Sequence, residues 1–135
     1  MRGLQALAAR TSDLFRVQCS FHCPAPVLVG DPSVGTDLYR IAQEAVTNSI
    51  KHGQAKHIEI ELGVTGEGGV LTVTDDGRGL SAKTDDSSGL GLRIMQYRAD
   101  TMGGSVSIQP ETSGGTRIVC TFPLSTLQTG TPGRT

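Results

Sequence analysis

The feature that most constrains this chain is the stretch from Arg40 to Gly53, which has the spacing of an amphipathic helix. Residues advance by about 100° each around a helix, so Glu44, Asn48 and Lys51 fall within roughly 60° of one another. The pattern therefore predicts a helix that packs on one side and offers a carboxylate, an amide and an ammonium group on the other. The packing side carries Ile41, Ala42, Ala45, Val46, Ser49 and Ile50.

A polar flank of this kind is, by itself, typical of an ordinary surface helix, because charge pairs at this spacing are common. Two glycine-rich segments downstream favour a functional interpretation: Asp75-Asp76-Gly77-Arg78-Gly79 and Gly89-Leu90-Gly91-Leu92. Glycine at these spacings lets the backbone approach a ligand or another segment closely, which a side chain would prevent.

In order and spacing the three segments resemble the N, G1 and G2 boxes of the GHKL ATP-binding family. That family includes sensor histidine kinases, gyrase-type topoisomerases, heat-shock chaperones and mismatch-repair ATPases. The resemblance implies the Bergerat fold, an α+β two-layer sandwich. In this fold a mixed, mostly antiparallel sheet is covered on one face by about three helices.

Periodic patterns predict the order of the elements along the chain. Strands are expected at residues 16–21, 27–29, 57–62, 70–74, 105–109 and 116–122, with a hairpin joining the third and fourth. Helices are expected at 3–15, 32–53 and 90–102. The first helix should present an apolar stripe made of Leu4, Leu7, Ala8 and Leu14.

Helix ends are also marked in the sequence. Asp31 suits an N-cap and Pro32 the first helical position. Gly53 suits the left-handed residue that commonly ends a helix, and Gly103-Gly104 should stop the last helix.

Two polar segments are expected to be mobile. Residues 80–88 are too polar to pack and read as a lid. The catalytic domain would then span residues 1–124, and residues 125–135 would form a disordered tail.

Composition narrows the classes of partner and the cellular location. Twelve basic residues stand against 13 acidic ones without a basic run, so no nucleic-acid surface is expected. No apolar run is as long as a membrane span, so this segment should make no direct membrane contact. The three cysteines, Cys19, Cys23 and Cys120, cannot all pair in disulfides, which fits the reducing cytoplasm. Membrane anchoring of a parent protein stays open.

The resemblance assigns adenine recognition to the G1 box. Asp75 matches the carboxylate that accepts a hydrogen bond from the adenine amine, and Gly77 and Gly79 would let the backbone press against the base. Thr116 matches the hydroxyl that helps to hold a water molecule in the adenine site. An Asp-Asp-Gly sequence is also an ordinary turn signal.

The resemblance assigns phosphate and magnesium binding to the N and G2 boxes. Asn48 matches the Mg²⁺ ligand, Glu44 the base or water-orienting group, and Lys51 and His52 positions associated with phosphate contacts. Gly89, Leu90, Gly91 and Leu92 would turn free N–H groups and a positive helix end toward the phosphates of ATP. A histidine at a helix C-terminus also fits favourable dipole chemistry, and Arg93 fits either a phosphate contact or a solvent-facing position.

Within the family the chain looks most like sensor histidine kinases of the nitrate/nitrite-sensor type, through residues 38–52 and 93–104. The resemblance implies transfer of the γ-phosphoryl group of ATP to a histidine on a separate dimerisation domain, which this chain lacks. A response regulator would act downstream. The alternatives are an anti-sigma-factor-type serine kinase and an ATP-operated binding module without catalysis.

Overall fold

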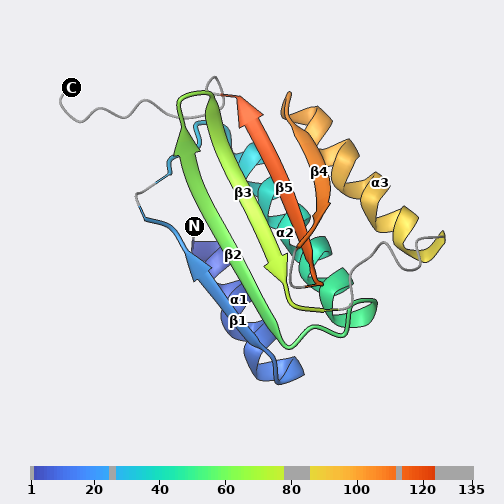
Figure 1. The fold of residues 1–135 in the computed structure, drawn as a ribbon. Helices are drawn as coiled ribbons and strands as arrows, with labels where there is room; N and C mark the ends of the chain where they lie inside the picture. Colours follow the sequence, from blue (N-terminus) through green and yellow to red (C-terminus); the bar gives the residue numbers. More distant parts are fainter. Residues whose placement is uncertain (1, 25–26, 78–85, 112–113, 124–135) are drawn as a thin grey trace.

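The computed structural model describes residues 2–24, 27–77, 86–111 and 114–123 of the 135-residue chain (Figure 1). In chain order the elements are α1 (Arg2–Phe15), β1 (Gln18–His22), α2 (Pro32–Lys51), β2 (His57–Thr65), β3 (Gly68–Asp75), α3 (Asp86–Thr101), β4 (Ser105–Pro110) and β5 (Thr116–Pro123).

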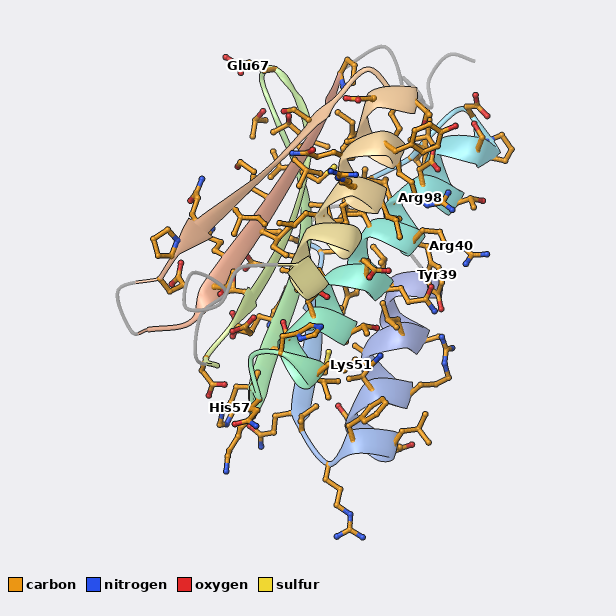
Figure 2. The ribbon with its side chains drawn as sticks, turned by 90° about the vertical axis from the view of Figure 1, so that its right-hand side faces the viewer. Tyr39, Arg40, Lys51, His57, Glu67 and Arg98 are labelled. Carbon is orange, nitrogen blue, oxygen red and sulfur yellow. The ribbon has the colours of Figure 1, made fainter. Side chains whose placement is uncertain are left out.

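The strands form a five-stranded sheet in the order β1-β2-β3-β5-β4. β1 runs parallel to β2, and the other neighbouring strands are antiparallel. All three helices lie on one face of this sheet, with α2 between α1 and α3 (Figures 1 and 2). The predicted α+β sandwich, with a mixed and mostly antiparallel sheet, is therefore confirmed.

Helix α2 is the centre of the core because its apolar stripe faces the sheet. Ile41, Ala42 and Ala45 have no exposed surface, and Ser49 is 4% exposed. Asp31 caps the helix as predicted, since its Oδ1 accepts a hydrogen bond from the Ser33 backbone N–H. In the facing sheet, β2 alternates exposed and buried residues from His57 to Leu62, so Ile58, Ile60 and Leu62 point toward the helices.

Two expectations about the first third of the chain are wrong. Residues 27–29 form no strand of the sheet, because only Val29 makes an isolated bridge while Val27 is buried in the core. Leu14 was expected on the buried stripe of α1 but is 72% exposed. It lies in the last turn of α1, which extends past the end of α2 (Figures 1 and 2), and it lines an open groove between the two helices.

The ends of α2 and α3 also differ from expectation. Gly53 does not take the left-handed conformation; that conformation belongs to Gln54, with φ of 54°. α3 begins at Asp86, so residues 86–88 of the predicted lid are helical. The remainder of that segment, Gly79 and the predicted tail lie outside the described residues.

The state of the cysteines and the character of the helices complete the description of the fold. All three cysteines are free thiols, with Cys120 buried and the others half-buried. Among the described residues, no helix combines the length and the apolar character needed to cross a membrane.

Candidate functional site

The carboxylate of Asp75 is buried at the end of β3 and is held from three directions. Its Oδ1 accepts hydrogen bonds from the backbone N–H groups of Gly77 at 2.8 Å and Thr116 at 3.3 Å. Its Oδ2 accepts a hydrogen bond of 2.6 Å from the hydroxyl of Ser49 on α2. A carboxylate has about four acceptor positions, so the described contacts leave one of them on Oδ2 for a further donor.

The glycines around Asp75 let backbone segments touch. A Cβ on Gly77 would collide with the carbonyl oxygen of Gly53, at the end of α2. A Cβ on Gly115 would collide with the backbone carbonyl of Asp75 itself. Gly77 therefore brings the segment after β3 against the end of α2, and its predicted contact with a base stays a prediction.

Glu44 and Asn48 form a second polar group on the flank of α2 that faces α3. A Cβ on Gly91 would lie 2.9 Å from Oε2 of Glu44 and 3.1 Å from Nδ2 of Asn48. Gly91 therefore lets α3 pass close to both side chains. Both of them belong to the set expected from the sequence.

The amide of Asn48 is the strongest sign of a ligand at this place. The residue is only 4% exposed, and within the described part of the chain its Nδ2 has no hydrogen-bond partner. A buried polar group without a partner costs about 1–3 kcal/mol, so native structures rarely keep one without a reason. A bound polar group beside Asn48 would remove this cost.

The two polar groups form one site because Asn48 and Ser49 are adjacent on α2. Asn48 turns toward Glu44 and Gly91, while Ser49 turns toward Asp75. Helix α2 thus connects the G1 segment to the G2 segment. Thr116 belongs to the site through its backbone N–H, whereas the expectation concerned its hydroxyl.

Lys51 does not join Glu44 and Asn48, although helical spacing placed it beside them. It lines a groove of about 270 Å³ between α1 and α2, together with Leu14 and Ile50, and Figure 2 shows it on the α1 side of α2. His52 caps the helix, with its backbone N–H donating to the carbonyl of Asn48 at 2.9 Å. The phosphate contacts expected of Lys51 and His52 stay predictions.

Both G2 glycines, Gly89 and Gly91, lie inside α3, because this helix begins at Asp86, earlier than the expected residue 90. The first four N–H groups of a helix lack an intrahelical partner, and Gly91 lies beyond them, in the second turn of α3. Gly91 and Leu92 therefore present no free N–H group in this arrangement, and the phosphate contacts expected of residues 89–92 stay predictions. Leu92 is half-buried and packs on the core.

Sequence reasoning missed Ser49 as a site residue and assigned it to packing. The available signal was a small hydroxyl side chain on the buried side of a helix, next to Asn48 and opposite the strand that delivers Asp75. It also assigned no role to His57 or Asp76. In the structure, Nδ1 of His57 lies 2.7 Å from Oδ2 of Asp76.

Comparisons with known proteins identify the family of the site. The profile described as "Histidine kinase-, DNA gyrase B-, and HSP90-like ATPase" matches residues 33–126. These residues include Glu44, Asn48 and Asp75, so the polar groups described above lie within the matched region.

Two curated relatives are sensor proteins of bacteria. The chain is 33% identical over 97 residues to the signal transduction histidine-protein kinase/phosphatase DegS of Bacillus subtilis (strain 168), a match covering 70% of this chain and 25% of that protein. It is 31% identical over 108 residues to the nitrate/nitrite sensor protein NarX of Escherichia coli (strain K12), covering 80% and 18%. The chain thus spans a quarter or less of these relatives.

Solved structures share the fold. The ATP binding domain of PrrB from Mycobacterium tuberculosis superposes with a TM-score of 0.72 at 24% identity, covering 90% of this chain and 91% of that one. The histidine kinase domain of the Erythrobacter litoralis EL346 blue-light activated histidine kinase gives a TM-score of 0.70 at 19% identity, covering 90% and 59%.

The close approach at Gly91 can be tested by comparing two helical glycines. Gly35 of α2 has no atom within 4 Å of a placed Cβ, so Gly35→Ala should raise the free energy of unfolding by roughly 0.5–1 kcal/mol through helix propensity. Gly91→Ala should give no such gain, because its methyl group would push against Glu44 and Asn48. Chemical denaturation measures both values, and an equal gain at the two positions would contradict the described contact.

Proposed function

This chain belongs to the family of histidine kinase-, DNA gyrase B- and HSP90-like ATPases, and we propose that it is the ATP-binding catalytic domain of a two-component sensor histidine kinase. The relatives that are sensor kinases support this assignment, as does the site built on α2. The proposed acceptor is a histidine on a dimerisation domain of the parent protein, and the proposed downstream partner is a response regulator. The proposed location is the cytoplasm.

The observation that carries the proposal is the acceptor position on Asp75 that the described residues leave unused. Adenine offers an exocyclic amine, which is a donor, where guanine offers a carbonyl oxygen. A buried carboxylate whose other acceptor positions are filled by Ser49, Gly77 and Thr116 has a fixed orientation. A hydrogen bond to a charged acceptor contributes about 1.5–3 kcal/mol, which is enough to favour adenine.

Asn48 and Glu44 suit the phosphate end of the nucleotide. Oxygen ligands hold Mg²⁺ best, and rotation of the Asn48 amide by 180° exchanges its nitrogen for its oxygen. The described residues contain no cluster of three or more His, Cys, Asp or Glu side chains that could hold a metal ion. We propose Asn48 as the residue that would hold Mg²⁺, through its amide oxygen.

Phosphoryl transfer needs an acceptor that the family resemblance places on another domain. A nitrogen of the acceptor imidazole would attack the γ-phosphorus, the bond to the β–γ bridging oxygen would break, and ADP would leave with those electrons. Bound Mg²⁺ would supply charge neutralisation of the phosphates. Glu44 lies where it could accept or orient a proton at the phosphate end.

Asp75→Asn tests the adenine contact. The asparagine oxygen can still accept the two backbone N–H groups, and its NH₂ can donate to Ser49 Oγ while that hydroxyl donates to the carbonyl of Ala45, 3.1 Å away. The melting temperature of the nucleotide-free protein should therefore stay nearly unchanged. ATP affinity measured by calorimetry should fall on the order of 100-fold, because a donor now faces the adenine amine. Unchanged affinity would refute the adenine role.

Asn48→Ala tests the metal ligand. Affinity for ATP in the presence of Mg²⁺ should fall on the order of tenfold, while affinity in the presence of a chelator changes little. Thr47→Ala is the matched control, since Thr47 is the preceding residue of α2 but lines the groove toward α1. Equal losses with and without Mg²⁺ would count against coordination by Asn48.

A transfer assay tests the reaction itself. The chain is mixed with ATP labelled on the γ-phosphate and with a separately produced histidine-bearing hairpin of a sensor kinase, with a His→Gln hairpin as control. We expect label on the histidine hairpin alone, in an acid-labile linkage. Label on an added serine-protein substrate would indicate a serine kinase instead. ATP binding without transfer to any acceptor would indicate a nucleotide-operated binding module.

A further inference from the structure

We propose that Asp76, acting with His57, is a positioning residue that holds Asp75 in the orientation needed to select adenine over guanine. The inference rests on the nucleotide-binding function proposed above. Asp76 and His57 touch neither Asn48 nor Glu44 in the described contacts. They lie on the opposite side of the segment 75–77 from the Asp75 carboxylate.

The carboxylate of Asp76 clamps the start of β2 to the end of β3. Its Oδ1 accepts hydrogen bonds from the backbone N–H groups of Lys56 at 2.8 Å and His57 at 2.9 Å. Its Oδ2 lies 2.7 Å from Nδ1 of His57. In return, the backbone N–H of Asp76 donates to the carbonyl of His57 at 3.2 Å. Four contacts therefore join this one residue to the beginning of β2.

The clamp lies on the solvent side of the strand. The side chain of Asp76 is 43% exposed and that of His57 61% exposed, whereas Asp75 is 8% exposed. Neighbouring residues of an extended segment point to opposite faces, so one carboxylate faces α2 and the next faces away. The backbone N–H groups of His57 and Lys56, with the His57 ring, lower the pKa of Asp76 to about 2, so its carboxylate is ionised at neutral pH.

The same clamp reaches the site through the link between α2 and β2. That link carries Gly53, whose carbonyl oxygen lies against Gly77, and the N–H of Gly77 donates to Oδ1 of Asp75. By binding Lys56 and His57, Asp76 fixes one end of the α2–β2 link, and Gly77 packs against this link at Gly53. Three consecutive residues, 75 to 77, are thus held by α2, by the α2–β2 link and by β5.

Loss of the clamp should affect orientation more than folding. Because the clamp is exposed, water can satisfy the N–H groups that Asp76 would leave free. The remaining contacts of Asp75 would then hold it less rigidly. A carboxylate with a fixed direction accepts from the adenine amine and repels the guanine carbonyl, whereas one that can turn away discriminates less. The ratio of ATP affinity to GTP affinity is therefore the property that Asp76 should control.

The experiment measures ATP and GTP affinities by calorimetry, with melting temperatures, for the wild type and three variants at residues 76 and 57. Asp76→Ala should weaken ATP binding about tenfold or more, change GTP binding little and move the ratio toward one. Asp76→Asn should keep most of the selectivity, since its amide oxygen can still accept the two backbone N–H groups. His57→Ala removes only the side-chain contact and should lower the ratio by a smaller factor.

Asp31→Ala is the matched control. Asp31 also accepts from a backbone N–H group, but it caps the opposite end of α2. Its loss should lower the melting temperature and leave the ratio unchanged. A wild-type ratio in both Asp76→Ala and His57→Ala would overturn the positioning role while leaving ATP binding intact. A wild type that binds no ATP would instead overturn the proposed function, and the positioning role with it.

Discussion

The burial of the Asp75 carboxylate is the constraint on which the rest of the structure depends. Removing an unpaired charge from water is costly, so every neighbouring segment must supply a donor or stay clear. Ser49 of α2 and the backbone N–H groups of Gly77 and Thr116 supply donors, and glycine at 115 leaves room for the backbone of Asp75. The carboxylate thereby fixes the distance between the central helix and the middle of the sheet.

Helix α2 links this constraint to the rest of the site because its two flanks do different work. The flank toward α3 carries Glu44 and Asn48. Gly91 of α3 faces them and has no side chain to cover them. The flank toward α1 carries Thr47 and Lys51, which line a groove. The surroundings of a polar residue on this helix therefore depend on which neighbouring helix it faces. Its angular position on the isolated helix does not determine these surroundings.

The same reasoning explains what could be predicted from the sequence. The helix, the hairpin and the place of Asp75 at a strand end follow from local periodicity, and the structure confirms the fold they imply. Helical spacing put Lys51 beside Glu44 and Asn48, yet it lines the groove toward α1, because residues about 60° apart on one helix can face different partners. Ser49, Asp76 and His57 depend on contacts between segments 19 to 26 residues apart, and no local pattern encodes such pairings.

The amide nitrogen of Asn48, which has no hydrogen-bond partner among the residues that the structure describes, suggests how the site gains affinity for a polar ligand. In the nucleotide-free protein that group carries a desolvation cost of about 1–3 kcal/mol, and the fold bears this cost because the apolar stripe of α2 dominates its packing. A ligand that satisfies the amide recovers this free energy in addition to forming its own contacts. The unpaired amide thus lowers the stability of the protein without ligand, and binding restores that free energy. A buried asparagine here therefore favours ligand binding, whereas a leucine would stabilise only the fold.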